Sequence, residues 1–304
     1  MRHIAFLLMV SVLLAGCIQL PGQQTQKTTG PAVVNVSQNA SASQVNITQT
    51  QQNATVIVNQ TTNTSSTTST TQSDALSAIP SSEISFKTKD SWIIYGTHYP
   101  SKSANPKVGI ILLHQLGANR SSFDSLIPVL HEELPDADIL AIDTRGHGKS
   151  TNIGTYTRFK LAGDYRAMTN DIKGARDYLA FFRNLQDFYL VGASIGSSSA
   201  ISYGAEDSSI QRIVMLSPGM NYKGVDITKP LADYHKYLYI VAADQDLQSA
   251  ADAKTAHTES DSDSALKKLL IYKDIGSAHG TEMLNASENS ADGALDGLIA
   301  GWLK

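Results

Sequence analysis

Gly192-Ala193-Ser194-Ile195-Gly196 is the stretch that decides the fold, because it joins an apolar run at residues 188–191 to a run of small residues at 197–205. The apolar run predicts a buried strand and the small-residue run predicts a helix. A serine at the apex of such a strand–turn–helix is held in a strained conformation that exposes its hydroxyl. The flanking glycines let strand and helix approach each other, and the amides of the helix N-terminus face any negative charge that develops beside Ser194. The stretch predicts a nucleophilic serine, although an ordinary Gly/Ser turn has the same pattern.

Strand and helix patterns alternate along the rest of the compact region. Predicted strands cover residues 84–87, 92–95, 108–113, 139–142, 188–191, 213–216, 237–242 and 269–272. Predicted helices cover residues 123–133, 161–182, 197–205 and 295–302. The first two strands suggest an antiparallel hairpin, and the others, continuously apolar, are typical of buried parallel strands. This order predicts an α/β fold, a mainly parallel sheet with helices on both faces and a site at the carboxyl ends of the strands.

A serine hydroxyl needs a base to take its proton, and the base needs an acid to orient it. Downstream of Ser194, Asp246 follows the strand at 237–242 and His279 lies in the loop after the last strand. The order Ser, Asp, His is the one expected for a nucleophile on a strand–helix turn. Asp244, two residues before Asp246, is a rival for the acid.

Two further motifs surround this arrangement. Residues 113–117 read Leu-His-Gln-Leu-Gly, and residues 143–150 read Asp-Thr-Arg-Gly-His-Gly-Lys-Ser. Together with the serine turn they resemble the α/β-hydrolase superfamily over about residues 83–304. The first is similar to the oxyanion loop that follows the third strand of that family, and the second to its Asp-X-Arg-Gly-His-Gly-X-Ser loop.

The resemblance implies roles for individual residues. Ser194 falls on the nucleophile, Asp246 on the acid and His279 on the base. Leu116 and Ile195 fall on the positions whose backbone amides form the oxyanion hole. Ala243 replaces a glycine that usually precedes the acid by three residues.

The substrate pocket is expected to include Gln115, Met220, Tyr222 and Leu247. Gln115 stands where the family usually has glycine, so its side chain is expected to shape the oxyanion loop or enter the pocket. Only about twenty residues separate the strands at 213–216 and 237–242, which leaves little room for a lid. An open pocket of this kind favours small or soluble esters over long-chain lipids.

Neighbouring polar residues are assigned structural roles. His114 and His147 are expected to organise their loops, and Asp143 and Arg145 to fix the second loop by ion pairing and hydrogen bonds. Residues 148–150, Gly-Lys-Ser, imitate the end of a phosphate-binding loop, but that motif needs glycine where Asp143 stands. Nucleotide binding is therefore rejected. His and Asp residues lack helical metal-ligand spacing, so neither a metal nor another cofactor is expected.

The N-terminal part of the chain has a different composition. Residues 1–16 are predicted to be a signal segment, ending in Leu-Ala-Gly before Cys17 as in a lipoprotein lipobox, and Cys17 is the only cysteine. Residues 17–80, rich in Thr, Ser, Asn and Gln, are predicted to be a disordered tether. An ordinary secretory peptide or an uncleaved anchor remains an alternative to the lipoprotein. Six glycosylation acceptors, all Asn-X-Ser/Thr, lie in the tether, beginning at Asn35, Asn39, Asn46, Asn53, Asn59 and Asn63.

These observations predict a serine esterase, held at the outer face of a membrane by a lipid and acting on small-molecule esters through residues 81–304. With a net charge of −4 and no basic stripe, the chain is not expected to bind nucleic acid. A peptidase or acyl-peptide hydrolase of the same fold is an alternative, because the same triad cleaves esters and amides. A non-catalytic surface binding module is another.

Overall fold

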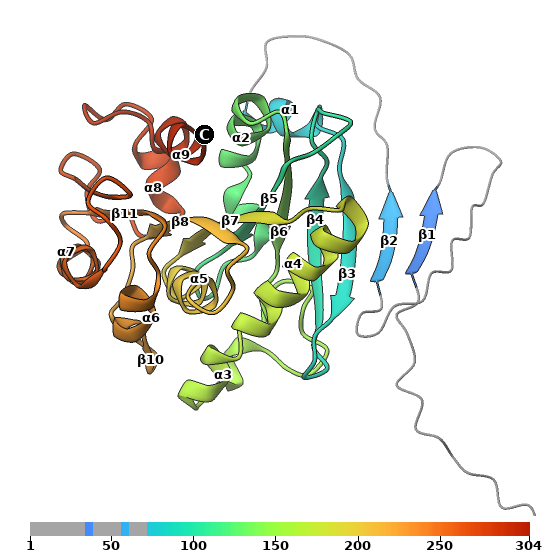
Figure 1. Ribbon diagram of the computed structural model, residues 1–304, viewed down its shortest axis with the longest axis horizontal. Coiled ribbons are helices and arrows are strands. Elements are labelled where there is room, and N and C mark those ends of the chain that lie inside the picture. The colour runs from blue at the N-terminus through green and yellow to red at the C-terminus, as the bar shows by residue number, and fades with distance from the viewer. Residues whose placement is uncertain (1–33, 39–55, 61–71) are drawn as a thin grey trace, which may run out of the picture.

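A ten-stranded sheet crosses the computed structural model of the protein (Figure 1), which describes residues 34–38, 56–60 and 72–304. Six neighbouring strands pair in parallel, in the spatial order β6, β5, β7, β8, β11 and β12. Strands β3 and β4 form an antiparallel hairpin beside them. The mainly parallel sheet of the predicted fold class is thereby confirmed. In spatial order the strands are β1 (Val34–Gln38), β2 (Val56–Gln60), β3 (Ser82–Lys87), β4 (Ile93–Tyr99), β6 (Ala137–Ile142), β5 (Val108–Leu113), β7 (Asp187–Ala193), β8 (Ile210–Leu216), β11 (Tyr237–Ala243) and β12 (Lys267–Tyr272).

The central strands are apolar on both faces because helices cover both faces. Along β5 every residue is buried, and alternate side chains enter different cores. Ile111 and Leu113 pack into the first core, whereas Ile110 and Leu112 pack into the second. This alternation explains why the strand reads as a continuous apolar run rather than as an alternating one.

Helices α3 to α7 contribute to the first core and α2, α8 and α9 to the second. Figure 1 shows the first group, with α4 and α5 lying along the sheet, and the second group around the C-terminus. The helices are α1 (Gln72–Ser77), α2 (Leu126–Glu133), α3 (Ala162–Arg166), α4 (Thr169–Arg183), α5 (Ile195–Gly204), α6 (Thr228–Asp233), α7 (Leu247–Glu259), α8 (Glu282–Ala286) and α9 (Leu295–Leu303), with 3-10 turns η1 (Arg120–Phe123) and η2 (Tyr156–Arg158).

Two predicted helices are interrupted in the structure. The helix expected over 123–133 is the 3-10 turn η1 followed by α2. The helix expected over 161–182 is divided into α3 and α4, because the amides at the joint donate to carbonyls three residues back, as Met168 N does to Tyr165 O. Tyr165 and Met168 stay in the core, while Leu161 lies outside the helix and is 70 % exposed.

The N-terminal side of the sheet extends beyond the predicted domain boundary. Within the predicted tether, β1 pairs in parallel with β2, and β2 pairs antiparallel with β3. Both segments begin with β-branched residues, Val34 and Val36 in β1 and residues 56–58 in β2, and such residues are favoured in strands. Helix α1 follows, and Leu76 and Ile79 pack on the second core. The predicted signal segment, Cys17 and the other residues of the tether lie outside the described residues.

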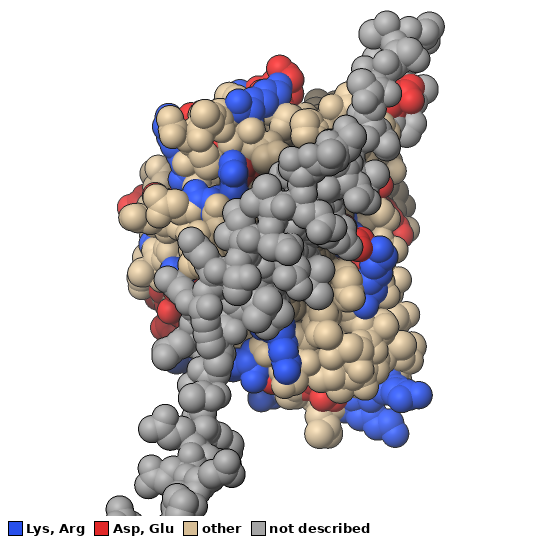
Figure 2. All heavy atoms as spheres, turned by 90° about the vertical axis from the view of Figure 1, so that its right-hand side faces the viewer, with Lys and Arg blue, Asp and Glu red and all other residues tan. Residues whose placement is uncertain are grey.

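Figure 2 views the molecule from the side of β1 and β2. Basic and acidic side chains are both spread over the part of this face that is not grey. In the described parts of the chain, no helix has both the length and the apolar character needed to cross a membrane.

Candidate active site

Ser194 occupies a strained turn between β7 and α5. Its backbone has φ 52° and ψ −116°, and its amide donates to Leu216 O at 2.8 Å. A Cβ at Gly192 would lie 2.4 Å from Gly196 O, and one at Gly196 would lie 2.3 Å from Leu113 O. Since no side chain fits in these gaps, the two glycines let β5, β7 and α5 converge at the serine.

Asp246 and His279 reach each other from loops that follow β11 and β12. His279 Nδ1 lies 2.7 Å from Asp246 Oδ2, so the ring donates this proton to the carboxylate and leaves Nε2 free to accept one. Asp244 has no contact with His279 among the interactions of the described residues. Its amide donates to Tyr272 O, and its buried Oδ1 finds no partner there.

Ser194 and His279 line one cavity of about 440 Å³. The hydroxyl of Ser194 makes no hydrogen bond within the described parts of the chain. Ser194 Oγ and the His279 ring are therefore not hydrogen-bonded to each other in this arrangement.

The amides of Leu116 and Ile195 both lack an acceptor within residues 72–304. Ile195 is the first residue of α5, where amides have no partner inside the helix. Gln115 O accepts from Ala118 N at 3.2 Å and from His114 Nδ1 at 2.8 Å. Because carbonyl and amide point in opposite directions across a trans peptide, these two bonds turn the Leu116 amide away from the loop interior. Two free donors thus lie at the ends of β5 and β7.

His114 serves the oxyanion loop as a neutral ring. Burial lowers the pKa of His114 to about 3, with the nearby His147 adding to the effect. While Nδ1 donates to Gln115 O, Nε2 accepts from Thr144 N at 3.1 Å. The ring consequently ties the loop at 113–117 to the loop at 143–150.

The loop at 143–150 is organised by its charged residues. Asp143 accepts from the amides of Arg120 and Lys149, and a Cβ at Gly148 would lie 2.3 Å from Asp143 Cγ. Arg145 makes ion pairs with two carboxylates, those of Asp90 and Asp171. These residues hold the loop in shape and do not line the cavity beside Ser194.

The cavity wall contains some of the predicted pocket residues. Met220 and Tyr222 line it, whereas Gln115 and Leu247 do not. Gln115 is a correction to the predicted pocket, because its side chain turns to the loop after His279 and accepts from Thr281 Oγ1 at 2.8 Å. Leu247 is also a correction: it begins α7 with its side chain 78 % exposed. The full lining is Ser194, Ser217, Pro218, Gly219, Met220, Asn221, Tyr222, Asp246, Gln248, Ser249, Asp252 and His279.

Sequence reasoning missed the part of this lining that comes from α7. Gln248, Ser249 and Asp252 lie in its first turns, directly after the predicted acid. Asp252 Oδ2 accepts from Met220 N at 3.1 Å and so joins α7 to the opposite wall. The spacings of four and three residues from Gln248 and Ser249 to Asp252 were the available signal, since residues so spaced are neighbours on one helix face.

A short hairpin forms one wall of the cavity. Strands β9 (Asn221–Tyr222) and β10 (Val225–Asp226) are joined by Lys223 and Gly224, with φ of 54° and 77°. Positive φ at both central residues is the mark of a type I′ turn. Arg166 holds the turn by donating to Gly224 O, and a Cβ at Gly224 would lie 2.6 Å from Ala162 Cβ.

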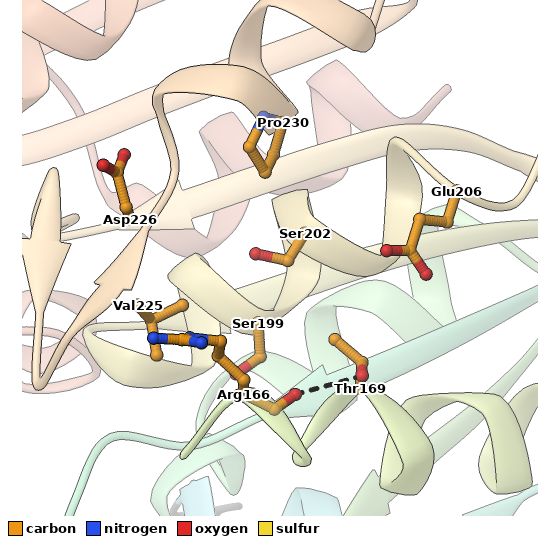
Figure 3. Close-up of a pocket in the computed structure, with 8 residues that line it drawn as sticks. All are labelled: Arg166, Thr169, Ser199, Ser202, Glu206, Val225, Asp226 and Pro230. Carbon is orange, nitrogen blue, oxygen red and sulfur yellow. Dashed lines mark hydrogen bonds between the residues drawn. The ribbon is translucent and has the colours of Figure 1, made fainter. Parts of the chain in front are cut away.

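A second cavity of about 280 Å³ lies on the other side of this hairpin (Figure 3). Ser199 and Ser202 of α5 face it, together with Val225 of β10 and Arg166. None of its lining residues belongs to the cavity beside Ser194. The hairpin therefore separates two hollows, and only one of them contains the serine and the histidine.

No group of three or more His, Cys, Asp or Glu residues in the described ranges could hold a metal ion.

Comparisons with known proteins agree with this architecture. A family profile described as the alpha/beta hydrolase fold matches residues 109–263. No curated protein sequence matches the chain.

Solved structures of hydrolases share the fold at low sequence identity. The esterase Pf2001 of Pyrococcus furiosus superposes with a TM-score of 0.61 at 17% identity, covering 78% of this chain and 96% of its own. A dienelactone hydrolase from Anabaena variabilis gives a TM-score of 0.59 at 19% identity, covering 74% of this chain and 97% of its own. Acetyl xylan esterase 1 from a Thermoanaerobacterium species gives 0.56 at 12% identity, covering 73% and 82%.

Proposed function

Because the chain belongs to the family with the alpha/beta hydrolase fold, we propose that it is a serine hydrolase that cleaves carboxylic esters. The single observation that carries the proposal is the contact between His279 Nδ1 and Asp246 Oδ2, beside a cavity that also contains the strained Ser194. The esterases among its structural neighbours support the same reaction class.

In the proposed reaction, Ser194 Oγ attacks the ester carbonyl while His279 Nε2 takes the hydroxyl proton. Asp246 keeps the ring in the tautomer that has Nε2 free and stabilises the imidazolium. The imidazolium then gives its proton to the departing alcohol. Water attacks the acyl-enzyme with the same histidine as base, which releases the acid and restores Ser194.

The developing oxyanion is assigned to the amides of Leu116 and Ile195. Neither amide has an acceptor within residues 72–304, so they need no reorganisation when charge appears on the carbonyl oxygen. Removing one such donor costs about 3–4 kcal/mol of transition-state stabilisation in comparable enzymes.

The substrate is proposed to be a small or soluble ester. A cavity of about 440 Å³ bounded by a single short hairpin fits a compact acyl group, and α6 is the one helix between β8 and β11. Within the wall, Met220 and Tyr222 offer apolar contact and Asp252 a carboxylate.

A fluorophosphonate probe and a panel of p-nitrophenyl esters test the proposal. Wild-type protein is expected to be labelled once and to hydrolyse short-chain esters, and Ser194→Ala is expected to lose both properties. Ser202→Ala is the matched control on the same helix, facing the second cavity. Faster cleavage of aminoacyl anilides than of esters would favour the peptidase, and a folded wild type with neither activity would favour a binding module.

We also propose that the protein is exported and lipid-anchored at Cys17. The support is sequence alone: the sole cysteine follows Leu14-Ala15-Gly16 at the end of an apolar run. Cys17→Ser is expected to move the protein from the membrane to the soluble fraction with its esterase activity intact. A variant that stays with the membrane after salt and carbonate washes would contradict the lipid anchor.

A further inference from the structure

Gln115 joins two loops that are far apart in the chain. Its side-chain Oε1 accepts from Thr281 Oγ1 at 2.8 Å and, over a longer 3.4 Å, from Thr281 N. The side chain also packs against Gly280, where a Cβ would lie 3.2 Å from Gln115 Cδ. Thr281 stands two residues after His279, so this contact connects the oxyanion loop to the loop of the proposed base.

The other end of Gln115 fixes the oxyanion loop itself. Its carbonyl accepts from His114 and Ala118, and these two bonds orient the peptide whose N–H belongs to Leu116. One residue therefore holds the proposed oxyanion donor through its backbone and the histidine loop through its side chain.

The histidine loop is held at other points as well. His279 Nδ1 contacts Asp246, His279 N donates to Glu282 Oε2 at 3.2 Å, and Gly280 N donates to Ser217 Oγ at 2.9 Å. Gly276, at the start of the loop, has φ 63° and open space where a Cβ would stand, and the side chain of His279 is 39 % exposed. Thr281 is the N-cap residue of α8, yet its side chain makes no capping bond and its hydroxyl is turned to Gln115.

We propose that Gln115 is a positioning residue, which sets the distance between the His279 ring and the Leu116 amide by holding Thr281. This role rests on the proposed function. Gln115 does not line the substrate cavity, so its loss is expected to reduce turnover rather than substrate binding. Misplacement of reacting groups by about 1 Å costs about 100-fold in rate, which sets the upper limit of the effect.

Four variants test the role by steady-state kinetics on p-nitrophenyl acetate. Gln115→Leu removes the acceptor, Thr281→Val removes the hydroxyl donor at constant shape, and Thr281→Ser keeps that donor. We expect kcat to fall about 10- to 100-fold in the first two with KM within about twofold, and Thr281→Ser to stay within about twofold of wild type. The kcat of the double variant Gln115→Leu/Thr281→Val is expected to be no lower than that of the less active single variant, because both substitutions remove the same interaction.

Each other outcome contradicts the role. Equal activities of Thr281→Val and Thr281→Ser, multiplicative losses in the double variant, or a change confined to KM would overturn it. If Gln115→Leu fails to unfold cooperatively on heating, the Thr281 pair decides alone. If the wild type hydrolyses no ester, the esterase proposal fails and this role fails with it. If the wild type is active and Gln115→Leu and Thr281→Val have the same kcat as the wild type, only this role fails.

Discussion

The carboxylates of Asp244 and Asp246 are two residues apart and meet different surroundings. Asp246 contacts the His279 ring at 2.7 Å, while the buried Oδ1 of Asp244 has no partner in the described part of the chain. Of these two carboxylates, only that of Asp246 therefore lies where it can hydrogen-bond to the imidazole of His279.

Replacement of each aspartate by asparagine separates the two roles. Asp246→Asn is expected to lower kcat by about 10⁴-fold, the loss seen for the orienting acid of serine proteases, because the wrong histidine tautomer is favoured. Asp244→Asn is expected to keep kcat within about tenfold, or about 1.4 kcal/mol in the barrier. Ester hydrolysis at saturating substrate and thermal unfolding measure both variants. The reverse ranking would assign the acid to Asp244.

The placement of single residues could be predicted from the sequence where it depends on their position along the chain. Ser194, Asp246 and His279 follow strand ends, so the sheet order brings their loops together. The side-chain directions of Gln115 and Leu247 depend on local torsions and on partners far along the chain, such as Thr281. The directions of these two side chains could therefore not be predicted from the sequence alone.

At the scale of elements, the hairpin between β9 and β10 controls the shape of the proposed substrate cavity. Gly224→Ala is expected to destabilise it, since φ of 77° strains any residue with a Cβ and the new methyl would lie 2.6 Å from Ala162 Cβ. We expect a loss of about 1–3 kcal/mol in the free energy of unfolding. KM for esters is expected to rise more than kcat falls, because the hairpin carries Asn221 and Tyr222 of the cavity wall.

Gly163→Ala is the matched control for this prediction. Gly163 lies in α3 next to Ala162, its added Cβ would have nothing within 4 Å, and its φ is not positive. Alanine in a helix is favoured over glycine by about 0.5–1 kcal/mol, so stability is expected to stay level or rise. Urea unfolding and Michaelis kinetics on both variants check the pair. An equal effect of the two substitutions would show that the hairpin turn is not the strained element.

Elements with a strong period could be predicted, and their interruptions could not. Strand β5 is a continuous apolar run in the sequence and lies buried in the centre of the sheet. The joint between α3 and α4 preserves the apolar spacing of Tyr165 and Met168, so periodicity continues across it without a visible break. The hairpin at 221–226 is too short to produce any period.

For the molecule as a whole, buried Asp138 connects several elements. Its side chain is 0 % exposed, lies beside His98 of β4, contacts Arg183 of α4 and accepts from Ser101 N. Burial alone would raise the pKa of Asp138, but the contacts with His98, Arg183 and the amide outweigh it and lower the pKa to about 2.

The folded-state pKa is below the usual aspartate value of 3.8, so the ionised carboxylate stabilises the fold above about pH 4. This contribution is lost as the pH falls through about 2. A shift of this size corresponds to roughly 2 kcal/mol. Asp138→Asn is therefore expected to lower the free energy of unfolding by roughly that amount at pH 7, and the gap to wild type is expected to narrow below pH 4.

Urea unfolding at a series of pH values measures this gap. Asp233→Asn is the control, because it breaks an exposed pair with Lys229, and such pairs contribute at most about 1 kcal/mol. A gap between Asp138→Asn and wild type that stays constant from pH 7 to pH 3 would show that the lost contribution is packing rather than charge.

The extent of the sheet illustrates the limit of prediction at this scale. Composition separates residues 81–304 from the polar segment before them, and strands β3 to β8, β11 and β12 follow from local patterns. The strands at Val34–Gln38 and Val56–Gln60 are short and isolated in a polar segment; Val56–Gln60 pairs with β3, and Val34–Gln38 pairs with Val56–Gln60. These strands form by pairing with a segment far along the chain, and a short stretch of sequence does not indicate such a partner.

The excursion between β8 and β11 offers a site for changing substrate range by insertion. It enters and leaves the sheet at Leu216 and Tyr237, and its tip is the two-residue turn at Lys223 and Gly224. Each doubling of the length of a flexible loop costs only about 0.6 kcal/mol in folding free energy. We therefore expect a longer tip to be tolerated with β8 and β11 unchanged. Hairpins of different lengths would then give the proposed substrate cavity different shapes, while Ser194, Asp246 and His279 stay where the sheet places them.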